Sequence, residues 1–272
     1  MARENLRYAV QTVKSLQSTQ PDAYNALVHK TALEPSEVET WFRAAENMYV
    51  PYDEDRQIVL QDDSLLDREP WDFRNTPPEH YPLLLFYHPL DIYRKRVIKQ
   101  ADVVLAMFLL GDRFSPEAKK RNFYFYDPLT TGDSSLSSCV EAIIAAQIGD
   151  MEKTFQYGMA ALLMDLADVG GNVKDGCHIT SMGGTWMMLT YGFGGMRDND
   201  GALSFWPRRA PEESATLRFP VTYRGQRLEI EIGLEKVKYV LREGESLVIR
   251  HETEEIQLTR EHPLAARTVS RR

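Results

Sequence analysis

The spacing of apolar residues changes once along this chain of 272 residues, and the change divides the chain into two parts. Through most of the chain, apolar residues recur at three- and four-residue intervals, as in Leu6 and Val10, which is the period of an amphipathic helix. After Asp198, short segments alternate apolar and polar residues or are rich in β-branched residues, and glycines separate them. The sequence therefore predicts a mostly α-helical domain over residues 1–197 and a small antiparallel β domain over residues 198–272.

Helix-start signals refine the helical part. Ser36 and Glu39 predict a capping box, and Ser115, followed by Pro-Glu, predicts another helix start. Two further helices are expected over residues 135–148 and 152–166. Gly149 and Asp150 separate them with a short turn, so we expect the two helices to pack as an antiparallel pair.

Composition argues against two classes of partner. The chain has 40 acidic and 32 basic residues, a net charge of -8, so it offers no basic surface for a nucleic-acid backbone. The longest apolar run, 101–110, is broken by Asp102 and is shorter than a membrane-spanning helix requires. The N-terminal segment has a helical pattern, not that of a signal peptide. Cys139 and Cys177 are the only cysteines, too few for a disulfide framework and without metal-type spacing, so we expect two buried thiols in a cytoplasmic protein.

A glycine-rich loop is the first candidate site. It spans residues 170–184 and is predicted to lead into a helix from about Thr185, with Thr180 or Ser181 as the N-cap. Free N–H groups at such a helix start carry partial positive charge, and His178 would add a further donor, which together favour an anion. Spacing alone leaves an ordinary flexible loop as the alternative.

Lys99 and Gln100 form the second candidate. They begin an apolar segment, residues 99–110, that is predicted to be a helix ended by Gly111. An ammonium beside an amide suits the vicinal hydroxyls of a sugar, which need both donors and acceptors. Spacing alone favours a solvated first helical turn, because lysine is almost always a surface residue.

Two more segments have structural readings beside functional ones. In the hydroxyl-rich segment 126–137, Asp133 or Ser134 is predicted to N-cap the next helix, which assigns both a structural role. Trp71 lies in a long proline-rich loop, residues 51–91, where its ring would either stack on a sugar or anchor the loop. The residue types leave both readings of Trp71 open.

Taken together, three ordered segments resemble family 65 of the glycoside hydrolases, the group with maltose, kojibiose and trehalose phosphorylases and some inverting hydrolases. They are residues 97–104, 131–137 and 175–186, and residues 191–198 extend the resemblance to the domain junction. The resemblance implies the C-terminal half of an (α/α)6 barrel catalytic domain, followed by a small sandwich-like antiparallel β domain.

The resemblance also implies roles for particular residues. Lys99 and Gln100 match family residues that contact the glucose before the cleaved bond. His178, Thr180 and Ser181 match the family loop that holds inorganic phosphate. The expected substrates are therefore an α-linked glucose disaccharide and phosphate as co-substrate, without a cofactor.

The catalytic acid of the family is a Glu that the resemblance places upstream of Met1. Glu4 lies in the first predicted helix turn, where a carboxylate stabilises the helix dipole. We therefore expect this chain alone to be inactive. A separate N-terminal half and a homodimer are the open possibilities for a protein partner.

The resemblance leaves three functions to distinguish. In an inverting phosphorylase, phosphate attacks the anomeric carbon while the acid protonates the leaving oxygen, whereas an inverting hydrolase needs a second carboxylate to activate water. Residues 178–184 contain no carboxylate, which favours a phosphorylase that releases β-glucose 1-phosphate. The alternatives are an inverting α-glucosidase of the trehalase type, with Asp175 as the base, and a non-catalytic remnant that binds sugar. Trehalose, maltose and kojibiose all remain open as substrates.

Overall fold

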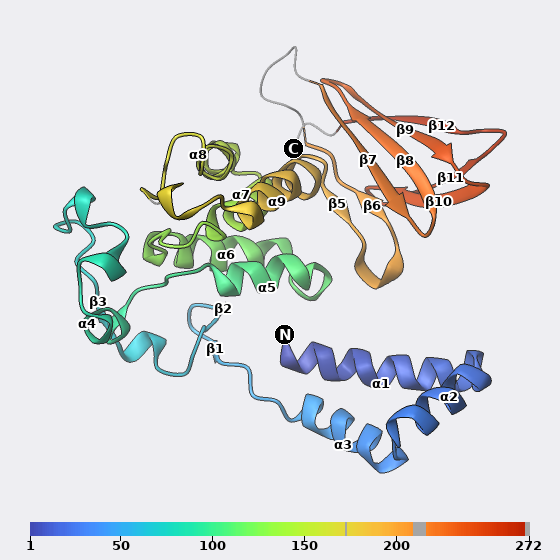
Figure 1. Cartoon of the computed structure of the whole chain (residues 1–272), viewed down its shortest axis with the longest axis horizontal. Coiled ribbons are helices and arrows are strands. Elements are labelled where there is room, and N and C mark those ends of the chain that lie inside the picture. Colours follow the sequence, from blue (N-terminus) through green and yellow to red (C-terminus); the bar gives the residue numbers. More distant parts are fainter. Residues whose placement is uncertain (172, 209–215, 270–272) are drawn as a thin grey trace. The chain divides into compact units, whose positions relative to one another are not determined.

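The computed structural model describes residues 1–171, 173–208 and 216–269 (Figure 1). It separates into two compact units, Met1–Tyr52 and Asp53–Arg272. Unit 1 contains three helices, of which α1 and α3 pack against each other. Their bounds are α1 (Ala2–Thr19), α2 (Pro21–Thr31) and α3 (Pro35–Glu46).

The start of α3 differs from the sequence-based expectation. The N-cap is Glu34, whose side chain accepts a hydrogen bond from the backbone of Glu37, and the Glu37 carboxylate accepts one from the Glu34 N–H at 3.0 Å. The capping box predicted at Ser36 and Glu39 is therefore wrong. Pro35 accounts for the shift, because its fixed φ and missing N–H suit the first helical position.

Unit 2 begins with an irregular segment and continues into a cluster of helices. The segment holds short strands and turns: β1 (Tyr52–Asp53), β2 (Ile58–Val59), η1 (Leu65–Asp67), β3 (Glu69–Pro70), η2 (Pro78–His80), η3 (Leu83–Leu85), α4 (Pro89–Tyr93) and β4 (Lys95–Arg96). The helices that follow are α5 (Asp102–Leu109), η4 (Gly111–Arg113), α6 (Pro116–Tyr126), η5 (Asp127–Leu129), α7 (Ser137–Ile148), α8 (Met151–Leu162), η6 (Val173–Asp175), α9 (Ile179–Met187) and the π-helix η7 (Met188–Phe193). The helix start predicted at Ser115 is confirmed, since its Oγ accepts from the Ala118 N–H at 3.2 Å.

Helix α7 is the centre of this cluster. It is buried from Ser137 to Ala146 and packs against α5, α6, α8 and α9. Gly149 follows it with φ of 85°, a left-handed conformation that favours glycine, and Asp150 caps α8 by accepting from the Lys153 N–H at 3.1 Å. The predicted pairing of these two helices across a Gly-Asp turn is therefore confirmed.

Glu141 is a carboxylic acid within this buried helix, with only 3% of its surface exposed. Burial raises the pKa of Glu141 to about 7; the negative charge of Asp127 adds to the rise and the ammonium of Lys153 opposes it. Asp127 is itself held by Lys153 Nζ at 2.8 Å and by the hydroxyl of Tyr157. Near pH 7, Glu141 is therefore partly ionised although it is buried.

We expect Glu141→Gln to stabilise the chain more at pH 8 than at pH 5. The folded pKa of Glu141 is raised, so the folded state binds more protons than the unfolded state between about pH 4.5 and pH 7. Stability contributed by this group is therefore lost as pH rises through that window. The gain from the substitution is expected to grow by about 1–3 kcal/mol between pH 5 and pH 8, measured by urea unfolding. Glu152→Gln, at an exposed position of α8, is the control, and an equal gain at both pH values would contradict the prediction.

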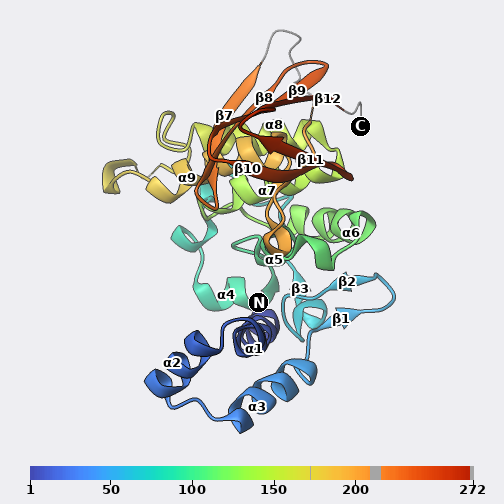
Figure 2. The same ribbon diagram turned by 90° about the vertical axis from the view of Figure 1, so that its right-hand side faces the viewer.

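The strands after α9 form two four-stranded sheets (Figure 2). One has the order β12-β9-β8-β7 and is antiparallel throughout; the other has the order β11-β10-β6-β5, in which β10 and β6 are parallel. The bounds are β5 (Met196–Arg197), η8 (Asn199–Gly201), β6 (Ser204–Phe205), β7 (Leu217–Tyr223), β8 (Gln226–Ile232), β9 (Lys236–Glu243), β10 (Ser246–His251), β11 (Glu254–Thr259) and β12 (Leu264–Thr268).

The two sheets share one apolar core. Phe205 and Ile249 enter it from one sheet, and Leu228 and Tyr239 enter it from the other. The predicted fold class, helices followed by a small and mainly antiparallel β part, is confirmed. The proposed division into residues 1–197 and 198–272 stays a prediction. Within the described residues, no helix is both long and apolar enough to cross a membrane.

Candidate functional site

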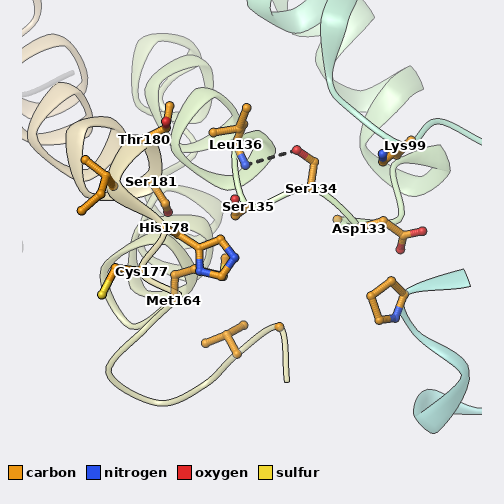
Figure 3. Close-up of a pocket in the computed structure, with 15 residues that line it drawn as sticks. Lys99, Asp133, Ser134, Ser135, Leu136, Met164, Cys177, His178, Thr180 and Ser181 are labelled. Atoms are coloured by element: carbon orange, nitrogen blue, oxygen red, sulfur yellow. Dashed lines mark hydrogen bonds between the residues drawn. The ribbon is translucent and has the colours of Figure 1, made fainter. Parts of the chain in front are cut away.

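A cavity of about 530 Å³ in unit 2 brings together most of the residues predicted from the sequence (Figure 3). Four of the five predicted site residues line it: Lys99, His178, Thr180 and Ser181. Gln100 is the fifth, and it does not line the cavity. Its Nε2 donates a hydrogen bond of 2.8 Å to the Oγ of Ser134, which does line the cavity.

Three segments that are distant in sequence supply most of the wall. In Figure 3, Lys99 and Asp133 lie on one side of the cavity and His178 and Ser181 lie on the other. Ser134 and Ser135 lie between them. The segments are the loop before α5, the loop before α7 and the start of α9. A small molecule in this cavity would therefore have an ammonium on one side and an imidazole on the other.

Backbone hydrogen bonds hold the two loops together on the Lys99 side. The Ile98 N–H donates to the Leu129 carbonyl, and the Thr131 N–H donates to the Ile98 carbonyl, each at 2.9 Å. The Ala101 N–H also donates to the Oγ of Ser137 at 3.3 Å. These bonds fix the backbone on both sides of Lys99, while its own side chain remains exposed to the cavity.

Asp165 fixes the position of His178 on the opposite side. The carboxylate accepts from the backbone N–H of His178 at 2.9 Å and pairs with the ring Nδ1 at 2.6 Å. The side-chain bond, together with the backbone bond and the charge of His178, lowers the pKa of Asp165, so the carboxylate is ionised near neutral pH. Because an ionised carboxylate only accepts, we infer that Nδ1 carries the proton, which leaves Nε2 for a ligand.

The start of α9 corrects the predicted cap. The helix begins at Ile179, with His178 at the N-cap position and without a side-chain cap. Thr180 and Ser181 are the second and third residues of the helix, so neither is the N-cap. The predicted helix start at about Thr185 is therefore also wrong. Their backbone N–H groups have no hydrogen-bond acceptor among the described residues, as is normal in a first helical turn.

Ser181 adds an unpartnered hydroxyl to these backbone donors. It is 1% exposed, and within the described part of the chain its Oγ has no hydrogen-bond partner. A buried hydroxyl without a partner costs about 1–3 kcal/mol, which a ligand oxygen would recover. The first turn of α9 and His178 together can therefore bind an oxyanion.

The hydroxyl-rich loop before α7 has a different role from the one predicted. Helix α7 begins at Ser137, with Leu136 at the N-cap position, so neither Asp133 nor Ser134 is its N-cap. Ser134 Oγ accepts instead from the Leu136 N–H at 3.3 Å. Asp133 lines the cavity, and its Oδ1 is buried without a partner among the described residues. The prediction that Asp133 acts mainly by capping is therefore wrong.

Trp71 and Asp175 do not contribute to this cavity. Trp71 Nε1 donates to Thr76 Oγ1 at 2.8 Å, and its ring meets Tyr87 edge to face, which supports its reading as a loop anchor. Asp175 lies in the single turn η6, is exposed and is not part of the cavity wall. It is therefore poorly placed to activate water there.

The two cysteines have unequal surroundings. Cys139 is buried, as predicted, against α9, where a Cβ on Gly184 would lie 2.5 Å from Sγ. Cys177 is exposed and lines the cavity, so the prediction that both thiols are buried is wrong. The glycine-rich loop carries Cys177 outward because it turns there before α9 begins.

Both parts of the chain match the same family of enzymes. Residues 1–187 match the family model described as the glycosyl hydrolase family 65 central catalytic domain. Residues 196–258 match the one described as the C-terminal domain of family 65. These two matches cover most of the described chain.

Individual relatives support the match. An α,α-trehalose phosphorylase of Geobacillus stearothermophilus is 43% identical over 264 residues, which is 97% of this chain and 34% of that protein. A kojibiose phosphorylase of Caldanaerobacter subterraneus subsp. tengcongensis is 31% identical over 91% of this chain and 32% of its own length. A solved structure, described as a putative kojibiose phosphorylase from the human microbiome, has the same fold, with a TM-score of 0.83 and 24% identity, over 95% of this chain and 36% of that one. The chain spans about a third of the length of these relatives.

Proposed function

The chain belongs to glycosyl hydrolase family 65, and we propose that it supplies part of the active site of an inverting disaccharide phosphorylase. Its relatives include trehalose and kojibiose phosphorylases. In the proposed reaction, inorganic phosphate attacks the anomeric carbon of an α-linked glucose unit and β-glucose 1-phosphate leaves. The cavity between Lys99 and His178 is the proposed place where phosphate and glucose meet.

The unpartnered donors at the start of α9 are the observation that carries this proposal. The N–H groups of Thr180 and Ser181 and the buried Ser181 hydroxyl have no hydrogen-bond partner among the described residues, so an oxygen ligand could accept from them. They stand at the positive end of the helix dipole, which favours negative charge. A phosphate ion uses all of these donors, whereas one water molecule uses few of them.

His178 completes the proposed phosphate site. Asp165 holds the imidazole by two hydrogen bonds, so the ring is oriented before phosphate arrives. A pre-oriented donor loses little conformational entropy on binding.

Lys99 and Gln100 are the proposed contacts to the glucose unit. Lys99 faces the cavity on an anchored backbone, and Gln100 reaches the wall through Ser134. Because Gln100 bonds Ser134 and does not line the cavity, its proposed effect is to orient this hydroxyl or to rotate toward the sugar when it binds. Both possibilities leave the glucose unit on the side away from His178.

The remaining parts of the reaction are assigned to the part of the enzyme that corresponds to the other two-thirds of the relatives. We propose that the general acid, a Glu, comes from that part and that the present chain alone does not turn over. A cytoplasmic location, and assembly with a separate N-terminal half or as a homodimer, belong to the same proposal.

Product analysis with and without phosphate tests the proposal. The protein to use is this chain joined to its natural upstream sequence, with trehalose first, because the trehalose phosphorylase is the relative with 43% identity. We expect β-glucose 1-phosphate, identified by proton NMR, only when phosphate is present. Free glucose as the sole product at saturating phosphate would contradict the phosphorylase and favour a hydrolase.

The position of Asp133 in the cavity wall favours an inverting hydrolase as the second candidate. Its carboxylate lines the same cavity and has one buried oxygen without a partner in the described chain, so it is better placed than Asp175 to activate water. A hydrolase would work without phosphate and lose about 10²–10⁴-fold in rate on Asp133→Asn. In the phosphorylase, removal of phosphate stops the reaction with Asp133 intact.

A further inference from the structure

A second cavity, of about 550 Å³, lies at the other end of α7. Its wall includes Gln147 and Gly149 at the C-terminal end of that helix, whereas Ser134 and Leu136, at the N-terminal end, line the first cavity. A helix of 12 residues is about 18 Å long, so the two cavities are separate. Helix α6, the π-helix η7 and the strands β5 and β6 also contribute residues to the second wall.

Lys119 is the unusual member of this wall. It is 4% exposed, and in the described part of the chain its ammonium has no ion pair or side-chain hydrogen bond. The ammonium lies beside Gly111 and Asn199, which also line the cavity. A Cβ placed on Gly111 would be 3.5 Å from Lys119 Nζ and 3.8 Å from Asn199 Nδ2. An ammonium taken out of water normally has a partner, since its burial is costly.

Arg197 brings a second buried cation to the same wall. Its Nη1 donates to the carbonyls of Tyr191 at 2.7 Å and Met196 at 2.6 Å, whereas its Nε is buried and has no partner in the described residues. Burial lowers the pKa of Lys119 to about 8, and repulsion from Arg197 adds to this fall. Two neighbouring cations with unsatisfied donors are the arrangement that a bound anion stabilises.

Asp112, Glu252 and Arg208 are the other acidic and basic residues that line the cavity. Asp112 raises the pKa of Lys119, and Glu252 is the second carboxylate that lines the cavity. Arg208 is a third cation, and its Nη2 donates to the backbone carbonyl of Gln147 at 3.0 Å. Two carboxylates thus face three cations. An anion with one negative charge would balance this count of lining residues.

We propose that this second cavity binds the phosphate group of a small phosphorylated molecule, with the oxyanion held by Lys119 and Arg197. Two cations at one site favour the doubly charged, three-oxygen end of a phosphate monoester over a single carboxylate. The volume exceeds that of a phosphate ion and falls in the range of small-molecule sites. Trp206, which lines the cavity with 39% of its surface exposed, offers a flat face for the non-phosphate part of the ligand.

The titration of Lys119 tests the proposal on the 272-residue chain itself. The chain is labelled with ¹³C and ¹⁵N in its lysines, and the NMR signal of the lysine with the lowest pKa is followed from pH 6 to pH 11. In chloride this signal is expected to titrate near pH 8. Inorganic phosphate or glucose 6-phosphate at constant ionic strength is expected to raise its pKa by about one unit, which corresponds to tenfold tighter binding to the ammonium than to the amine.

The sign of this coupling also predicts how affinity depends on pH. A ligand that raises the pKa of Lys119 binds the protonated form better, so affinity should fall as pH rises through about 8 and 9. Tighter binding of glucose 6-phosphate than of inorganic phosphate would identify a sugar phosphate as the ligand class. Equal binding would identify the phosphate group as the whole determinant.

Two variants of α6 complete the test. Lys119→Met is expected to remove the low-pKa signal and to weaken the affinity for glucose 6-phosphate, measured by calorimetry, at least tenfold. The chain is expected to stay folded, because loss of an uncompensated buried charge does not destabilise it. Lys120→Met, at the exposed neighbouring position, is the control and is expected to change neither. A lysine signal that responds equally to chloride, or that responds to neither phosphate compound, would overturn the proposal.

Discussion

His178→Ala is expected to raise the KM for phosphate by about 10- to 150-fold, while the KM for the disaccharide stays within about twofold. The imidazole is held toward the cavity by Asp165, and its loss removes a charge-assisted hydrogen bond to the proposed phosphate. Such bonds contribute about 1.5–3 kcal/mol, which gives the expected range. The measurement is the initial rate at varied phosphate, in the enzyme that joins this chain to its upstream sequence.

Asp175→Asn is the matched control, because this carboxylate lies in the same loop but is exposed and outside the cavity wall. We expect it to change the KM for phosphate by less than about twofold. Asp165→Asn is expected to reproduce a part of the His178→Ala effect, since it releases the ring without removing it. Equal rises in both KM values for His178→Ala would instead place His178 on the sugar.

Phe205→Ala is expected to lower the free energy of unfolding by about 3–5 kcal/mol, the usual cost of truncating a fully buried phenylalanine. Phe205 is 0% exposed, and its ring centroid lies 5.2 Å from that of Tyr239 on the facing sheet. It stands on β6, the strand that links β5 to β10, so the cavity left behind lies where the two sheets meet. The measurement is urea unfolding of the 272-residue chain.

Val248→Ala is the control for this substitution. Val248 lies on β10 of the same sheet but is 48% exposed, so its loss opens no cavity, and we expect a change below about 1 kcal/mol. A cost for Phe205→Ala that does not exceed the cost for Val248→Ala would mean that the two sheets do not share a tight core.

The periodicity of the sequence was enough to predict the fold class, whereas the caps were less predictable. Ser115 precedes a proline and a glutamate, and these fix the helix start at one place, which the structure confirms. Asp133 and Ser181 lie in segments with several hydroxyls or carboxylates in a row, any of which can cap a helix. In both segments the structure starts the helix elsewhere, at Ser137 and at Ile179, and neither helix has a side-chain cap at its N-cap position.

The candidate site was predictable in part. The resemblance to a known family singled out Lys99 and His178, and the structure places both in one cavity. Asp165 was missed, because it reaches His178 across the glycine-rich loop, and no residue spacing relates a carboxylate near the end of one helix to a histidine before the next. The second cavity was missed for the same reason, since Lys119 and Arg197 become neighbours only when the chain folds.

The unequal burial of the two cysteines gives the protein its own attachment point for a reporter dye. Maleimides attack the thiolate, which Cys139 rarely forms because burial raises its pKa and α9 covers it. Cys177 is open to solvent and stands in the cavity wall. An environment-sensitive fluorophore added without any mutation would therefore go to Cys177 and change its emission when the cavity fills, which converts occupancy of the site into an optical signal.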